Sequence, residues 1–398
     1  MSWTLKKSRD LFYAETGQPR GQAFWIDEAV SMSGAGVEPN AIESAIAWNA
    51  VGAASRANCP LLHDVMVELS SIVDPRWKAR VDNIYAGRTV DGDNTAFSRG
   101  GVKGGMVAIS IHYSQSLIAY AGAWGQFLYA VDSRTQFPAE DWACLMKNMR
   151  DDLAQLMSDF QDRGLAVLSK SWPVLFRDAR QRDAVGEIVA SAERWIVAHE
   201  VAHHILRHAS SKIDEDAARE VRSFMAAPAM RVELVGLSRD QVQEIEADLL
   251  AFELVAGRFA KDTNALIIMQ GVVGALLATI AVGHLDGGWA TSPDSEHPGA
   301  FTRIAVLAKW ITLEHGDSPL AELPGANPGM TFQRLTAILL TYALWASGEE
   351  DVHPYVGSAD DQAAVDDGEP VWIQDYLFFA LQLGMLEADD ETPLIRQP

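Results

Sequence analysis

The sequence has very few cysteines. Its 398 residues include only Cys59 and Cys144, which are far apart and in no metal-binding spacing. A secreted protein of this size more often has a disulfide framework, so we expect two buried free thiols in a reducing cytoplasm. Lys6 and Lys7 near the N-terminus are followed by no apolar run, which predicts that this stretch is not a signal peptide. We therefore expect a cytoplasmic protein.

Basic residues are also scarce. Lys and Arg number 32 against 54 Asp and Glu, which gives a formal net charge of −22. A surface this acidic repels nucleic-acid phosphates and anionic membranes, and no basic run interrupts it. We expect no nucleic-acid partner.

Long apolar runs are confined to one segment. Residues 265–285 (ALIIMQGVVGALLATIAVGHL) are almost wholly apolar and long enough to span a bilayer. Gln270, His284 and the many Gly and Ala residues favour a buried helix, as does the absence of a Lys/Arg cluster or an aromatic belt on both flanks. A membrane-spanning helix is the alternative interpretation.

Helical spacing of apolar residues dominates the rest of the chain. A loop rich in Gly and Asp precedes one β-type run, Met106 to Ile111. Ser238 and Gln241 form a capping box, which opens a helix running to about Ala256. Further helices are expected at 41–57, 61–73, 114–131, 139–161, 185–208, 301–313, 331–346 and 371–386, with an acidic loop at 348–369. The predicted fold is α+β and predominantly helical, with one small sheet.

The stretch from His199 to His203 reads HEVAH. Residues four apart on a helix lie one turn above each other, so both imidazoles can reach one ion. Glu200 lies close enough to take a proton from a water on that ion, which gives two metal ligands and a general base. The alternative is a surface helix that happens to hold several histidines, and His204 and His208 fit that alternative as solvated or outer-shell residues.

A catalytic zinc needs a third protein ligand. A metzincin would have a histidine where Ala209 stands, so that class is excluded. Glu244 on a second predicted helix can supply the ligand, and Asp248, four residues on, shares its face. Asp248 can then accept the outer N–H of a zinc-bound histidine. Glu246 is expected on the other side of the helix as a solvated residue, and it is the fallback ligand.

These motifs resemble the M48-type gluzincin peptidases, which include HtpX-like and CAAX-prenyl-processing proteases. Asn94 to Phe97, with the strand from Gly104 to Ser110, looks like the family's glycine-led edge strand. The HEVAH and EIEAD helices follow, and then His297-Pro-Gly-Ala-Phe-Thr-Arg303, similar to the family's HPxxxxR motif. The resemblance covers roughly residues 90 to 310. The chain is also similar to the soluble phage-exclusion-type metallopeptidases, which share the two zinc motifs, and the residues do not decide between these branches.

The resemblance implies a zinc endopeptidase. One zinc per chain would be held by His199, His203 and Glu244, with Glu200 as general base. The peptide or protein substrate would lie extended beside strand 106–111. His297 would donate to the oxyanion and Arg303 would orient the local loop, although a structural helix start after Pro298 explains both residues equally well.

The resemblance also sets the expected domain organisation. A zincin-like gluzincin core with an active-site helix is expected at residues 91–312. A helical segment precedes it at 1–90, and a helical segment with the acidic loop follows at 313–398. Two other functions fit the same motifs. One is a catalytically inactive, metal-bearing module that binds peptides, and the other is a membrane-embedded protease of the M48 type.

Overall fold

The computed structural model describes most of the chain. The described residues are 4–18, 55–89, 96–101, 103–132, 138–163, 179–208, 219, 221–223, 234, 236–260, 264–285, 288–292, 295–315 and 332–348. Over these ranges the chain is α+β and predominantly helical, as the sequence predicts, with one three-stranded sheet. The expected helices at 41–57 and 371–386 and the acidic loop lie wholly or almost wholly outside the described residues.

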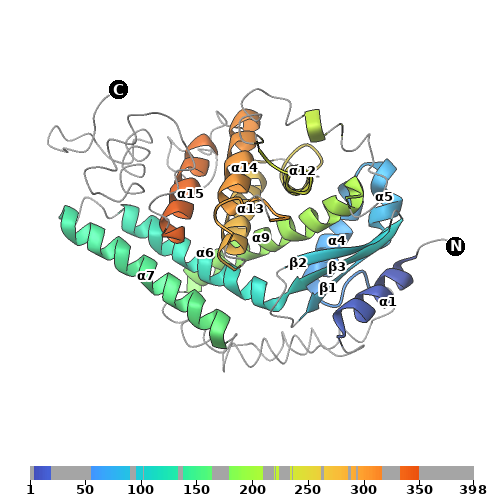
Figure 1. The fold of residues 1–398 in the computed structure, drawn as a ribbon, viewed down its shortest axis with the longest axis horizontal. Coiled ribbons are helices and arrows are strands. Elements are labelled where there is room, and N and C mark those ends of the chain that lie inside the picture. Colours follow the sequence, from blue (N-terminus) through green and yellow to red (C-terminus); the bar gives the residue numbers. More distant parts are fainter. Residues whose placement is uncertain are drawn as a thin grey trace.

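The elements follow one another in a simple order (Figure 1). They are α1 (Leu5–Thr16), α4 (Pro60–Ile72), α5 (Pro75–Val81), β1 (Ile84–Thr89), β2 (Ala96–Gly101), β3 (Gly104–Ser110), α6 (Ile111–Asp132), α7 (Ala139–Arg163), α9 (Ala179–Leu206), α12 (Arg239–Val255), α13 (Ala265–Leu285), α14 (Ala300–His315) and α15 (Phe332–Ser347).

The sheet is larger than the sequence indicated. Its order is β1-β3-β2, with β1 parallel and β2 antiparallel to β3. The sequence predicted only the run that became β3 and placed a loop and a helical segment where β1 and β2 lie. That prediction was wrong because β1 is buried along its whole length and so shows no alternation of polar and apolar residues. In β2, glycine and polar residues hide the strand pattern.

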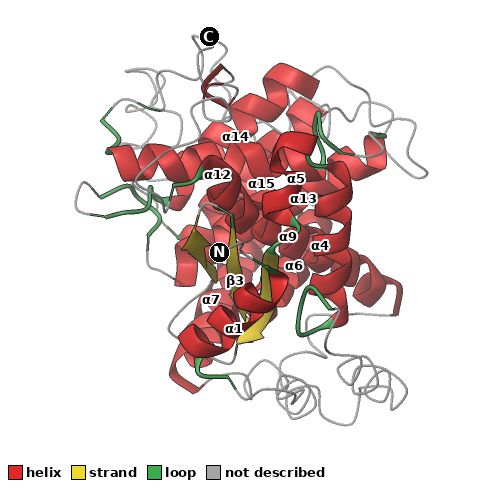
Figure 2. Cartoon of the chain, turned by 90° about the vertical axis from the view of Figure 1, so that its right-hand side faces the viewer, coloured by secondary structure: helices red, strands yellow, loops and turns green. Residues whose placement is uncertain are grey.

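The two faces of the sheet are covered by different helices. Tyr85, Met106 and Ala108 pack with Phe12 of α1 in a small core, and α1 lies in front of the strands in Figure 2. The alternate residues of the same strands, Ile84 and Val107 among them, join the main core, as expected from the two-residue period of a strand. The main core contains α9, so the sheet is held between α1 and α9.

Helix α9 is the central element of the fold. It crosses the middle of the molecule, with the sheet on one side and α13 and α14 on the other (Figure 1). A buried ion pair links it to β1, because Nη2 of Arg88 lies 2.7 Å from the carboxylate of Glu193. Breaking such a pair by removing one partner typically costs about 3–5 kcal/mol, so the pair fixes α9 on the sheet.

Helix α13 is the apolar segment singled out in the sequence. Among the described residues it is the one helix long and apolar enough, by length and composition alone, to cross a membrane. Most of it is buried against α9, α6 and α14. A Cβ built on Gly274 would lie 2.6 Å from the carbonyl carbon of Ser191, so the backbones of α13 and α9 touch at this point. This burial agrees with the buried-helix interpretation of the segment.

Candidate metal centre

Two helices supply the site predicted from the sequence. Helix α9 carries His199, Glu200 and His203 in its last two turns. Helix α12 begins at the predicted capping box, in which the Ser238 side chain accepts from the backbone N–H of Gln241 and the Gln241 side chain accepts from the N–H of Ser238. This cap fixes where α12 starts and therefore which of its residues face α9.

The structure brings His199, His203 and Glu244 together. Nε2 of His199 lies 3.1 Å from Nε2 of His203, and these atoms lie 3.4 and 3.3 Å from the two oxygens of Glu244. Ligand atoms bound about 2.0–2.1 Å from a tetrahedral zinc are separated by about 3.3 Å, from the bond lengths and the tetrahedral angle. The three side chains therefore fit one zinc ion without large rearrangement.

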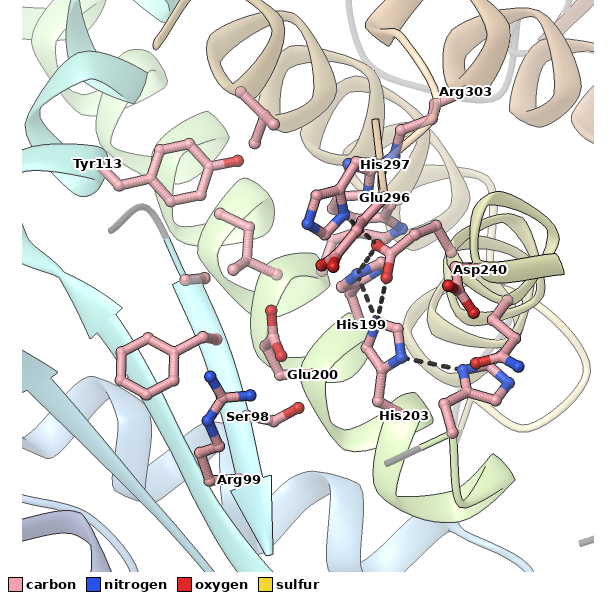
Figure 3. Close-up of a pocket in the computed structure, with 18 residues that line it drawn as sticks. Ser98, Arg99, Tyr113, His199, Glu200, His203, Asp240, Glu296, His297 and Arg303 are labelled. Atoms are coloured by element: carbon pink, nitrogen blue, oxygen red, sulfur yellow. Dashed lines mark hydrogen bonds and ion pairs between the residues drawn. The ribbon is translucent and has the colours of Figure 1, made fainter. Parts of the chain in front are cut away.

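These side chains open on a cavity of about 610 Å³. Figure 3 shows the rings of His199 and His203 turned toward each other, with Glu200 on the side that faces β2. Residues 96–99 of β2 form one wall, and Asp240 and Glu296 lie on the opposite side as exposed carboxylates. Glu200 is itself buried but borders the cavity, so it can act on a molecule bound beside the three ligand atoms.

The outer nitrogen of His199 faces a buried carboxylate. Its Nδ1 lies 2.8 Å from Oδ1 of Asp248, a distance typical of an ion pair, although the angles are not those of a well-directed hydrogen bond. Arg303 donates from Nε and Nη2 to the two Asp248 oxygens, at 2.8 and 2.6 Å. Burial lowers the pKa of His199, but Asp248 and Glu244 outweigh this effect and raise the pKa to about 10. Asp248 thus lies beside His199, as the helix spacing predicts. Arg303, which was expected to orient the local loop, is instead paired with Asp248.

The outer nitrogen of His203 faces a second series of buried contacts, through His208 to Glu246. His208 thus takes the outer-shell position that was one of its two expected placements, but the sequence did not connect it to His203 or Glu246. Nδ1 of His203 lies 2.9 Å from Nδ1 of His208, and Nε2 of His208 lies 3.1 Å from Oε2 of Glu246. Arg222 donates from Nε to Oε1 of Glu246 at 2.7 Å. Glu246 is fully buried, so its expected role as a solvated residue was wrong.

Local backbone geometry explains why the sequence does not show the contact between His208 and His203. Arg207 adopts a left-handed conformation, with φ of 61°, and ends the helix. The backbone N–H of His208 then donates to the carbonyl of His203 at 3.1 Å, as in a left-handed helix cap. This reversal of the chain direction brings the His208 ring back against the last turns of α9, next to His203. Helical spacing cannot reveal this contact, since residues five apart do not share a face of a regular helix.

His204 points away from the cavity and packs on the sheet. It is buried, and its Nε2 lies 3.2 Å from the carbonyl oxygen of Met106. Burial lowers the pKa of His204 to about 4. A Cβ on Gly105 would lie 2.3 Å from Cε1 of His204, so this glycine makes room for the histidine. The expectation that His204 is solvated or in the outer shell of the metal was wrong.

His297 lies at the mouth of the cavity. Its Nδ1 is 3.2 Å from Oε2 of Glu244, and its side chain is 62% exposed. The hydrogen bond with Glu244 raises the pKa of His297. In this arrangement the ring contacts the carboxylate of a candidate ligand, and its exposure leaves it able to turn toward a bound substrate. Pro298 follows just before α14 begins at Ala300.

The expected substrate strand needs one correction. The resemblance implies a substrate beside residues 106–111, but β3 is the central strand and has β1 and β2 on its two sides. The edge strand that borders the cavity is β2. A free strand edge has unpaired N–H and C=O groups with which an extended peptide can pair.

Comparison with known proteins gives one match. The family model described as Peptidase U49 matches residues 168–323. This range contains α9, α12 and α14 and excludes the three strands. The match indicates a peptidase, which is the broader part of the resemblance seen in the sequence. It gives no support to the M48-type assignment, since U49 is a different peptidase family. No curated protein and no solved structure matches the chain.

Proposed function

We propose that this protein is a zinc-dependent endopeptidase with one zinc per chain and Glu200 as its general base. The observation that carries the proposal is the trio of ligand atoms on His199, His203 and Glu244, whose separations fit a tetrahedral zinc. Two histidines from one helix and a glutamate from another constitute the gluzincin type of ligand set. The peptidase family match covers the same helices and supports the proposal that such an ion would be catalytic.

The mechanism follows from where each side chain lies. A bound zinc would supply Lewis acidity and lower the pKa of a coordinated water to about 7. Glu200, one residue after His199 and on the β2 side of it, accepts the proton of the attacking water and returns a proton to the leaving amine. His297 at the cavity mouth donates to the oxygen on which negative charge develops. Arg303 stays paired with Asp248 and acts by holding that carboxylate.

The substrate is a polypeptide bound in extended form along β2. Ser98 and Arg99 of this strand lie near Glu200 of α9 (Figure 3). Pairing of the substrate backbone with the edge of β2 would bring a peptide carbonyl to the ligand trio with little dependence on side chains. In the cavity, Glu200 lies near Arg99, and the carboxylates of Asp240 and Glu296 lie on the opposite side (Figure 3). Charged substrate side chains would therefore bind in one preferred direction along the strand.

Metal analysis together with peptide cleavage tests the proposal. The purified protein should contain one zinc per chain and cleave a mixed library of unstructured peptides. Glu200→Gln should keep the zinc and the fold but lose hydrolysis, because it removes only the general base, a group worth about 10²–10⁴-fold in rate. Equal turnover by Glu200→Gln and wild type would exclude this mechanism. Full zinc occupancy with no cleavage by the wild type would favour the peptide-binding module.

A further inference from the structure

The two candidate metal histidines have matching supports on their outer nitrogens. On one side, His199 meets Asp248, which is paired with Arg303. On the other side, His203 reaches Glu246 through His208, and Glu246 is paired with Arg222. Both carboxylates come from α12 and both are fully buried. Neither the ExxxD spacing nor the family match draws attention to the second support.

The donors and acceptors of the second support form one consistent chain. Nε2 of His203 faces the metal site, so in the ligating form the proton of this ring is on Nδ1. That N–H donates to Nδ1 of His208, which must then be the acceptor. The proton of His208 is on Nε2 and donates to Oε2 of Glu246, while Arg222 donates to Oε1. Every contact then has one donor and one acceptor.

We propose that His208 and Glu246 are positioning residues that fix His203 in the tautomer and orientation required to bind the metal. His208 transmits the effect of the Glu246 carboxylate to a histidine that the carboxylate does not touch. A carboxylate on the outer nitrogen of a metal-bound histidine orients the ring and raises its basicity. The inference depends on the proposed function, because it assumes that His203 is a zinc ligand.

The surroundings of Glu246 make it suitable for this role. Its carboxylate has no exposure and is held by two donors, His208 and Arg222. The carboxylate forms an ion pair with the guanidinium of Arg222, whose Nε lies 2.7 Å from Oε1. A charged acceptor makes a stronger hydrogen bond than a neutral one, so the chain from His203 ends on a strong acceptor.

Zinc affinity measured by competition with a chelator tests the inference. His208→Phe keeps a ring of similar shape but removes both hydrogen bonds, and Glu246 still has Arg222 as a partner. Glu246→Gln keeps the side-chain shape and removes the charge. Each variant should bind zinc about 10–100-fold more weakly, the usual loss when an outer partner of a metal ligand is removed. His315→Phe makes the same chemical change at the far end of α14 and should bind zinc as the wild type does.

A second measurement separates positioning from folding. The melting temperature of each zinc-free variant shows whether the fold is intact. Nitrogen NMR of histidine-labelled, zinc-loaded wild type should show His203 protonated on Nδ1 and His208 on Nε2, a signature that a merely structural contact would not require. The opposite tautomer for His208, or a doubly protonated ring, would overturn the inference even where a variant fails to fold.

The possible failures can be told apart. A wild-type protein that binds no zinc overturns the proposed function and this inference together. A wild-type protein that binds zinc, with unchanged affinity in folded His208→Phe and Glu246→Gln, overturns the inference alone.

Discussion

Asp248 offers the most informative perturbation of the site. It is buried between His199 and Arg303, and its two oxygens accept both hydrogen bonds from the Arg303 guanidinium. Replacing it with alanine removes the carboxylate from His199 but also leaves Arg303 buried without a counter-charge. That second effect typically costs about 3–5 kcal/mol of folding free energy. Asp248→Ala alone therefore mixes loss of metal affinity with loss of stability.

A paired change separates these two effects. In Asp248→Asn/Arg303→Gln both partners are neutral, so no charge is left buried alone and two amides can still hydrogen-bond. His199 then faces an amide instead of a carboxylate. We expect zinc affinity to fall by about 10–100-fold, which corresponds to about 1.4–2.7 kcal/mol. The free energy of unfolding of the zinc-free protein should fall by less than in Asp248→Ala.

The assay is zinc competition with a chelator, with urea unfolding of the same zinc-free samples as the companion measurement. Arg303→Gln alone serves as the control, since it leaves the Asp248 carboxylate next to His199. Wild-type zinc affinity in the folded double variant would refute the idea that Asp248 acts through His199. Asp248 would then be only the buried partner of Arg303.

Three other predictions test the ligand set and the packing around it. Glu244→Ala should lose most of its zinc, and full occupancy by metal analysis would show that another carboxylate is the third ligand. Gly274→Ala should lower the melting temperature, because the new Cβ would lie 2.6 Å from the Ser191 backbone. Gly186→Ala is the control: its Cβ would have no atom within 4 Å, so it should raise the free energy of unfolding by about 1 kcal/mol. Equal effects of the two changes on stability would contradict the close contact of the helices. Burial lowers the pKa of His284, so the unfolded state binds a proton on this ring more readily than the folded state does. The free energy of unfolding should therefore decrease as the pH falls below about 6.5, and it should decrease less in His284→Phe. Identical pH profiles of the two proteins in urea unfolding would contradict this.

The sequence was informative where one element determines the geometry. The spacing from His199 to His203 needs only a regular helix to bring two imidazoles together. The capping box at Ser238 fixes the start of α12, so the placement of Glu244 and Asp248 on one face follows from helical period alone. The bounds of α13 also agree with the apolar run, residues 265–285, because the middle of that helix, residues 271–281, is buried on all sides.

The sequence was uninformative where tertiary contacts decide. Strand β1 has no alternation to detect, since α1 covers one of its faces and the main core covers the other. The second support of the site depends on the backbone reversal at Arg207 and on the segment that carries Arg222, and neither follows from spacing. Glu246 lies two residues from Glu244 and so on a different side of α12. That position predicts a solvated side chain only if the helix has a side that faces solvent. Helix α12 is buried on several sides, and the rule fails there.

The two glycine contacts of α9 give a physical reason why this helix is suited to the proposed metal site. Gly105 of β3 lets the sheet approach His204 on one side, and Gly274 of α13 lets a helix backbone touch Ser191 on the other. His199 and His203 lie on the stretch of α9 between these two contacts. Metal ligands need to be held to within about half an ångström of their working geometry. At Gly274 the two helix backbones touch with no side chain between them, and at Gly105 the strand backbone touches the short, buried ring of His204. Few rotatable bonds separate the packed surfaces at either contact, so both restrain the helix closely. The glycines would therefore restrain the position of α9, as the two buried carboxylates are proposed to restrain the orientation of its histidines.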